Sequence, residues 1–349
     1  MATEDSPRDD GRIREKLAQL DRASRNRQLL YLAGILVLLA VTAAGLWFVE
    51  LTVGLLYRNL PGWTEFLGGF FPPDFVDLTS QTKERGIGGL DAIVQTILHP
   101  QWFVSSVLNA ELGEASVLVS AAVLTVIMGF LGTVLGFPLA LLLGILGSER
   151  VVPFPFNFVF RGIMSTIRAV PALIWALIFV PLTGFGPVTG VLAIGTDTIG
   201  NLGRLLTDEL EEVEDGPIEA VGSTGASRPQ TIIFGMLSQV YNGYVAWTLY
   251  VLEINTRIAI GLGVVGVGGI GQYIDAKISL GAFGTPSAYP QAAAGIIVVI
   301  AIVLTVEMLS SRIRSYMRPG ENEGRGLLDI IRGLGDTQKW LGTENPKKD

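Results

Sequence analysis

The chain has 349 residues, 49% of them hydrophobic and only 16% charged, with a net charge of −7 and a pI near 5.0. Long uncharged stretches separate its charged segments, as is typical of membrane proteins. It has no cysteine, which excludes disulfides and thiolate metal sites, and its one histidine, His99, has no visible partner for a metal or catalytic role.

About 20 apolar residues let a helix cross a hydrocarbon core of roughly 30 Å. The first such stretch, residues 29–49, follows a basic segment at 1–28 and is predicted to span the membrane. A cleaved signal peptide is the alternative, but its apolar region would be shorter and nearer the terminus. Residues 51–114 hold four prolines and more acidic than basic residues, which predicts an outward-facing loop.

Further spans are expected at residues 115–146, 162–182, 188–206, from about 241 to the glycines after 261, and 288–306. The fold is therefore predicted to be all-α, a polytopic membrane bundle of six transmembrane helices. Basic residues at the N-terminus, around Arg150 and Arg161, and at Arg312 and Arg314 predict a cell-membrane protein with both termini in the cytoplasm. The expected divisions are 1–28, 29–114, 115–309 with an inner loop at 208–238, and a cytoplasmic tail at 310–349.

The inner loop between the fourth and fifth spans is patterned as two short helices. Asp215 is placed to cap the first, and Pro217 falls in its opening turn. Gly225 provides a break, and Ser227 with Gln230 has the spacing of a capping box for the second helix. A helix-turn-helix elbow on the inner face of a membrane protein is a docking device.

Glu219 and Ala220, then Gly225 and Ala226, followed by Gly235, resemble the Glu-Ala-Ala loop of permease subunits in binding-protein-dependent ABC importers. In that family the loop forms coupling helices that fit a groove on a separate ATPase subunit. The resemblance implies an ATPase-coupling loop formed by Asp215, Pro217, Glu219, Ala220, Gly225, Ala226, Ser227, Arg228 and Gly235.

The loop departs from the family pattern at its end, where Leu237 is followed by Ser238 in place of the usual proline. Because serine keeps the backbone N–H that proline lacks, the break before the fifth span is expected to be softer.

Two more blocks resemble the phosphonate branch of these permeases: Arg168 to Pro171 leading into 175–180, and 248–257 leading into the glycine run 266–271. The resemblance covers about 115–309. It implies a methionine-importer-like permease fold that pairs with a second copy and receives phosphonate or a related phosphorus oxyanion from an extracytoplasmic binding protein. It also implies that no cofactor is bound directly, since ATP and Mg are used by the partner ATPase; membrane lipids are expected partners and nucleic acid is not.

Ionisable groups inside a spanning helix usually face a cavity, pair with one another or mark a pathway. The candidates for a translocation pathway are Arg168, Pro171, Asp197, Glu253, Asn255 and Arg257. An arginine could hold phosphonate oxygens in a two-pronged contact. The alternatives are that Arg257 only neutralises Glu253, four residues away on the same helix face, and that Arg168 extends to the inner interface.

Glycines at 261–271 match a dinucleotide-binding spacing, but they lie between spans rather than after a strand, so we expect no such site. No Gly-Lys-Ser or Gly-Lys-Thr phosphate loop occurs, so ATP hydrolysis must come from a partner.

Three alternatives keep the same helices. A channel or ion-coupled secondary transporter would work without an ATPase partner. A membrane-embedded enzyme is the second alternative, but the sequence shows no paired cluster of His and carboxylate residues that such chemistry would need. An importer for phosphite, phosphate, methionine or a quaternary amine would share the hydropathy pattern.

Overall fold

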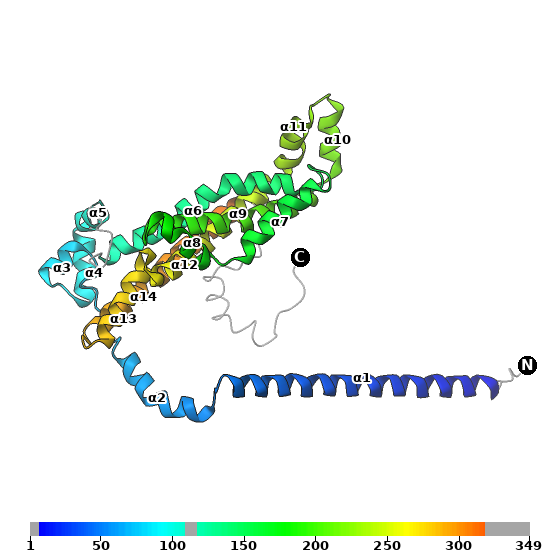
Figure 1. Ribbon diagram of the computed structural model, residues 1–349, viewed down its shortest axis with the longest axis horizontal. Helices are drawn as coiled ribbons and strands as arrows, with labels where there is room; N and C mark the ends of the chain where they lie inside the picture. Colours follow the sequence, from blue (N-terminus) through cyan, green and yellow to red (C-terminus); the bar gives the residue numbers. More distant parts are fainter. Residues whose placement is uncertain (1–6, 109–116, 318–349) are drawn as a thin grey trace, which may run out of the picture. The chain divides into compact units, whose positions relative to one another are not determined.

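The computed structural model describes residues 7–108 and 117–317, and this part of the chain is helical and contains no strand. It forms two compact units, residues 1–68 and 69–349 (Figure 1). Residues 1–6, 109–116 and 318–349 lie outside the described residues, and with them the predicted division between 114 and 115 and most of the predicted tail.

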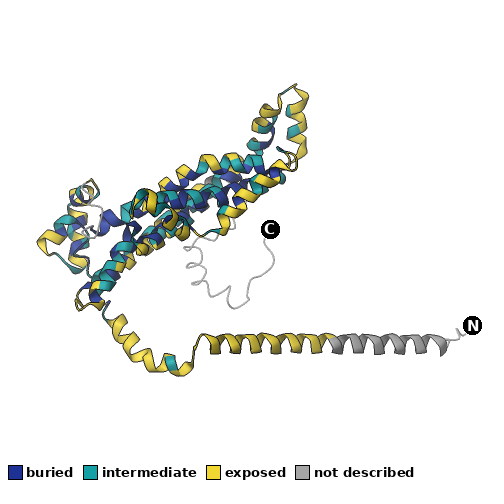
Figure 2. Cartoon of the chain, in the orientation of Figure 1, coloured by how far each residue is buried: buried dark blue, intermediate teal, exposed yellow. Residues whose placement is uncertain are grey.

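The first unit consists of α1 (Pro7–Phe48) and α2 (Val53–Gly68). The apolar part of α1, Arg27–Phe48, is 22 residues long, which at about 1.5 Å per residue matches the membrane core. Its side chains are exposed along its whole length, as Figure 2 shows. Exposed leucines in such numbers need hydrocarbon around them, so the first predicted span is present as a helix of the expected length.

The second unit begins with three short helices and continues with the long helices of the bundle. In chain order they are α3 (Ser80–Arg85), α4 (Gly89–Leu98), α5 (Pro100–Leu108), α6 (Leu118–Gly147), α7 (Phe156–Ala169), α8 (Ala172–Thr183), α9 (Pro187–Glu211), α10 (Asp215–Ser223), α11 (Arg228–Gln230), η1 (Thr231–Leu237), α12 (Ser238–Leu262), η2 (Gly263–Val267), α13 (Ile270–Ala282) and α14 (Ala288–Met317). The predicted loop at 51–114 is thus largely helical, because α2 to α5 lie within it.

The centre of the bundle is a seam of small residues between α6 and α9. A Cβ atom added to Gly132 would lie 2.4 Å from the Ile194 side chain, and one on Gly136 would lie 2.5 Å from the backbone oxygen of Gly195. Glycine therefore permits a backbone contact that any side chain would prevent. Figure 2 shows the buried residues concentrated along these inner helices.

The third predicted span, 162–182, is not one straight helix. It is split into α7 and α8, which meet at an angle of 90°. The break falls at Val170, which is extended (φ −103°, ψ 115°) because it precedes Pro171. Pro171 is visible in the sequence, but a hydropathy window measures only the length of an apolar stretch and does not report a change in the direction of the helix axis.

Counted by length and hydropathy, four helices in the described residues can cross a membrane, and five if the bent pair is one span. The fourth predicted span, 188–206, coincides with α9, which does not pass this test. Thirteen of its 25 residues are buried, among them Asp197 and three threonines. Thr198 accepts from Asn255 of α12, and Thr207 donates to the Gly144 oxygen of α6. These polar side chains are covered by neighbouring helices, so α9 does not need a continuous apolar surface.

The fifth span is followed by a helix that the sequence pattern did not predict. The helical stretch Arg228–Val267 ends where Gly266, Gly268 and Gly269 take positive φ angles of 87°, 114° and 79°. These left-handed conformations suit glycine and reverse the chain into α13. The glycine run therefore joins two helices, which excludes the dinucleotide-binding arrangement of strand, turn and helix.

The residues 69–108, called the cap here, lie at the end of this unit opposite α10 and α11 (Figure 1). Asp77 anchors the cap to the bundle: its carboxylate accepts from Lys277 Nζ at 2.5 Å and from the Tyr273 hydroxyl at 3.2 Å. Burial, with Asp77 close by, raises the pKa of Tyr273 above its ordinary range, so the phenol stays a donor. The Lys277 and Asp77 side chains are only 17% and 5% exposed, so this is an ion pair with little solvent screening.

Removing one partner of this pair should leave a buried charge without compensation. Asp77→Leu or Lys277→Met alone is expected to destabilise the second unit by about 3 kcal/mol, and the double variant by less than the sum of the two. Thermal unfolding of the detergent-solubilised protein measures this. Strictly additive losses would contradict the assigned pairing.

Candidate functional site

The predicted inner loop forms a projecting elbow, residues 215–237, made of α10, α11 and η1. No residue of α10 is buried. In Figure 1 α10 and α11 extend beyond the ends of α6, α7 and α9. α10 therefore projects from the bundle with its surface exposed, whereas Met236 of η1 is buried in the core of the bundle.

The start of α10 differs in one detail from the prediction. Glu214, not Asp215, occupies the N-cap position, and no side chain caps the helix. Asp215 is the first helical residue, and its carboxylate accepts a hydrogen bond from Arg150 Nη1 at 2.6 Å. Pro217 lies in the first turn as predicted, where its missing N–H is not needed.

The turn of the elbow matches the sequence signal. Gly225 has φ 80°, in the left-handed region that disfavours side chains. Ser227 then begins α11, and its backbone N–H donates to Gln230 Oε1 at 2.8 Å, one half of the predicted capping box. The half-buried Ala226 lies between them.

The prediction of a separate second elbow helix was wrong: this segment is the beginning of the fifth span. α11 has three residues and passes through the π-helix η1 directly into α12. Ser238 has φ −61° and ψ −33°, so the chain has no break where the family pattern has proline. We expected a weakened break in the chain at this position, but the helix continues through it.

Gly235 lets the two arms of the elbow touch. A Cβ atom on Gly235 would lie 3.3 Å from Ile218 Cα and 3.7 Å from the Pro217 oxygen. Gln239 Nε2 adds polar contacts to the Gly235 oxygen at 2.6 Å and the Glu214 oxygen at 3.2 Å. The two arms of the elbow, α10 and the segment α11–η1, are held together by this close backbone approach and by the Gln239 side chain. No residue of α10 is buried by these contacts.

Glu219 and Ala220 lie on the exposed surface of α10. Glu219 makes no ion pair with any described residue, whereas the exposed Arg228 donates to the Val151 oxygen at 3.3 Å. The predicted coupling residues are thus gathered on one elbow, but they divide into residues that build it (Pro217, Gly225, Ser227, Gly235), residues that anchor it (Asp215, Arg228) and residues that it displays (Glu219, Ala220).

The sequence pattern gave no functional part to Arg150, Arg161 or Glu211, which the structure places together at the base of the elbow. The two arginines entered only as topology markers, and Glu211 only as one of several acidic residues. A signal was present in the opposite charges of the two arginines, Arg150 and Arg161, and the acidic 208–215 segment.

Asn255 holds three helices together. It is 1% exposed, and its Nδ2 donates to Thr133 Oγ1 on α6 and Thr198 Oγ1 on α9, each at 2.8 Å. Both hydroxyls already donate to backbone oxygens one turn earlier, so they accept from the amide and fix its orientation. Within one chain this side chain fastens α12 to the seam.

Glu253 and Arg257 form the ion pair that their spacing predicted, with Arg257 Nη2 2.6 Å from Glu253 Oε1. Arg314 on α14 lies 3.7 Å from the other Glu253 oxygen, and Glu307 lies 3.7 Å from Arg257. Two acids and two arginines therefore neutralise one another where α12 meets α14. This arrangement accounts for the charges without requiring a ligand.

Arg168 and Asp197 lie on neighbouring helices. Asp197 is buried and accepts from Asn201 Nδ2 at 2.9 Å, while Arg168 is exposed beside the bend at Pro171 and packs against Gly200. The six pathway candidates thus occupy three places in the unit: beside the bend between α7 and α8, at the seam between α6 and α9, and where α12 meets α14. No group of three His, Cys, Asp or Glu side chains in this part of the chain could hold a metal.

No protein-family model matches the chain. Among curated proteins, it is 31% identical over 227 residues to HtxC of Stutzerimonas stutzeri, described as a phosphite transport system permease, covering 64% of this chain and 77% of that protein. It is 30% identical over 195 residues to the phosphite transport system permease protein PtxC of the same organism, covering 56% and 69%.

The phosphate-import permease protein PhnE of Mycolicibacterium smegmatis is 37% identical over 201 residues, 57% of this chain, and the match spans only 37% of that longer protein. Among solved structures, an inward-facing MetNI methionine ABC transporter aligns with a TM-score of 0.48 and 20% identity over 56% of this chain and 92% of the other.

HtxC and PtxC are each matched at 30% identity or more over more than two thirds of their length. Both proteins are named as transport system permeases, and the apolar helices described above make this chain a multi-pass membrane protein. The chain belongs to the family of permease subunits of phosphonate and phosphite ABC transport systems.

Proposed function

We propose that the chain is the membrane-spanning subunit of an ATP-driven importer, and that it translocates phosphonate or a related phosphorus oxyanion delivered by an extracytoplasmic binding protein. The observation that carries this proposal is the elbow: no residue of α10 is buried, and the elbow is joined to α9 through residues 212–214 on one side and continues directly into α12 on the other. A projecting element joined to two central helices is suited to receive work from a separate motor.

The substrate class follows from what the relatives are named for, which is phosphite, phosphate and phosphonate. These anions share a tetrahedral phosphorus with charged oxygens, which guanidinium groups bind well. In this chain Arg168 is the pathway candidate best placed to meet an anion, because it is exposed, whereas Arg257 is paired. Asp197, Pro171, Glu253 and Asn255 then shape or fasten the helices around the route.

The partners in this proposal are two ATPase subunits, which bind ATP and Mg, the binding protein, membrane lipids and a second copy of the chain. α8 supports the last two, because only Ala172 and Ala176 of its 12 residues are buried and its Leu177, Ile178 and Leu182 are 52%, 53% and 76% exposed. With the elbow and both termini in the cytoplasm, the cap faces outward toward the binding protein.

Glu219→Lys and Gly225→Asp should abolish uptake while the protein remains inserted. Glu219 is exposed, and a Cβ atom at Gly225 would have nothing within 4 Å, so the cost to folding is small, about 1 to 2 kcal/mol for a left-handed residue. Uptake of labelled substrate by cells expressing the whole transporter measures the effect, with membrane content checked by immunoblot. Glu65→Lys, an exposed charge reversal on α2, is the matched control.

Normal uptake by both elbow variants would favour a channel or secondary transporter, because those need no ATPase contact. Pull-down of the ATPase by the solubilised chain gives an independent readout. Retained binding in both variants would also argue against the elbow as the docking element.

The substrate class can be tested by competition. Methylphosphonate, phosphite and phosphate should each reduce uptake of a labelled phosphorus oxyanion in vesicles that contain the complete transporter and its binding protein. Sulfate, methionine and a quaternary amine should not, because they lack the tetrahedral phosphorus group. Competition by methionine alone would assign the chain to another substrate class.

A further inference from the structure

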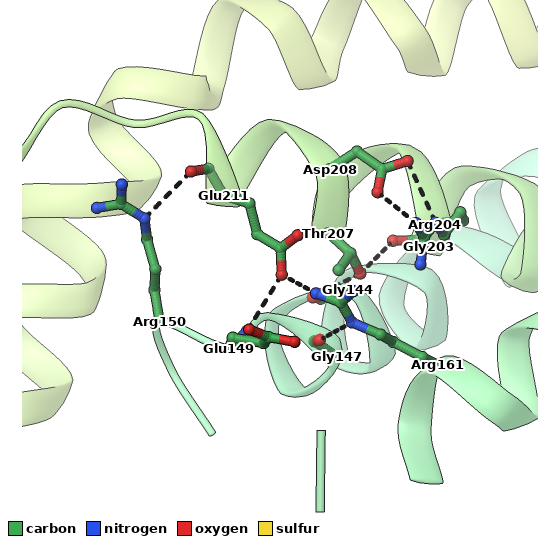
Figure 3. Close-up of polar contacts among 10 residues, drawn as sticks. All are labelled: Gly144, Gly147, Glu149, Arg150, Arg161, Gly203, Arg204, Thr207, Asp208 and Glu211. Atoms are coloured by element: carbon green, nitrogen blue, oxygen red, sulfur yellow. Dashed lines mark hydrogen bonds and ion pairs between the residues drawn. The ribbon is translucent and has the colours of Figure 1, made fainter. Parts of the chain in front are cut away.

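Glu211, the last residue of α9, gathers contacts from the loop between α6 and α7 (Figure 3). Its carboxylate forms an ion pair with the Arg161 side chain of α7 and accepts from the Glu149 backbone N–H at 3.3 Å. Its backbone oxygen accepts from Arg150 Nε at 3.2 Å. One residue thus binds three residues that lie 50 to 62 positions earlier in the chain.

The same loop also contacts the elbow. Arg150 uses its other nitrogen to bind Asp215 at the first turn of α10, and Arg228 at the start of α11 donates to the Val151 oxygen. Arg161 Nε in turn donates to the Gly147 oxygen at 2.7 Å, where α6 ends. The α6–α7 loop is therefore connected to both arms of the elbow and to the ends of α6, α7 and α9.

We propose that Glu211 is a positioning residue, the centre of a clamp with Arg150 and Arg161 that makes α6 and α7 follow the elbow. This inference rests on the proposed function, in which the elbow is moved by the ATPase. By covalent connection the elbow joins only α9 and α12. Without the clamp, displacement of the elbow would reach α7, the bend and Arg168 only through the Arg228–Val151 hydrogen bond and side-chain packing.

The clamp is separate from what holds the bundle together. Thr207 Oγ1, one turn earlier on α9, donates to the Gly144 oxygen at 3.0 Å, and Gly203 packs against the Ala140 backbone. These contacts keep α6 on α9 when Glu211 loses its charge. Loss of the clamp should then affect transmission more than folding.

Figure 3 also shows the natural control, the Arg204–Asp208 pair at 2.9 Å. Both of its residues belong to α9, four positions apart, so it connects no other element. Its side chains are 31% and 48% exposed, against 20% and 32% for Arg161 and Glu211. Asp208→Asn removes an acidic partner of an arginine in the same helix without touching the loop.

The first experiment measures coupling in the complete transporter in proteoliposomes, as substrate taken up per ATP hydrolysed. Glu211→Gln and Arg161→Gln should lower this ratio about 2- to 30-fold, the range expected for coupling losses of 0.5 to 2 kcal/mol. Arg161→Lys, which keeps the charge, should retain more coupling than Arg161→Gln. Asp208→Asn should leave the ratio unchanged, and all variants should unfold at nearly the same temperature.

The second experiment needs no ATPase and so separates failure of the clamp from failure of the proposed function. Because the chain has no cysteine, spin labels can be placed with Phe158→Cys on α7 and Ser223→Cys on α10, both exposed. The distance distribution between them should broaden on adding Glu211→Gln and stay narrow with Asp208→Asn. Unchanged distances together with an unchanged coupling ratio would overturn the clamp, as would equal effects of the Asp208 variant.

Discussion

The close approach of α6 and α9 is the constraint on which the second unit depends. In hydrocarbon, helices gain little from burying apolar surface against one another, so association relies on packing and on a few polar contacts. Glycines at 132 and 136 bring the backbones together, and this brings Thr133 and Thr198 within reach of one amide, that of Asn255. The position of α12 follows from a contact that side chains on the seam would have prevented.

Charged side chains within this unit pair with one another where separate elements meet. Glu253 and Arg257 are balanced by Glu307 and Arg314 at the junction of α12 and α14, so four costly charges become one neutral group. Asp77 and Lys277 do the same at the cap. These groups fasten helices to each other, which accounts for their charges without a bound ligand.

The sequence was sufficient for features that depend on local chemistry: the apolar spans, the left-handed Gly225, the Ser227–Gln230 pair and the Glu253–Arg257 pair. It was insufficient where tertiary contacts decide. The sequence predicted a span at 188–206, where α9 lies, but not that its polar side is buried against other helices. The extra helix α13 and the anchored cap depend on glycine turns and on the remote Asp77–Lys277 pair, and Glu211 gains its contacts from residues 50 to 62 positions earlier in the chain.

The two arms of the elbow are joined to the bundle by different physical means, and this difference bears on how force could pass between them. On the α12 side the link is a continuous helix, since Ser238 interrupts nothing and η1 only widens the turn. On the α9 side helical continuity is lost at residues 212–214, and polar contacts around Glu211 take its place. A continuous helix transmits both translation and rotation, whereas a clamp of hydrogen bonds and ion pairs transmits motion only while its contacts are intact. In the proposed importer, α12 would therefore follow the elbow in every state, and α6 and α7 only in states that preserve the clamp.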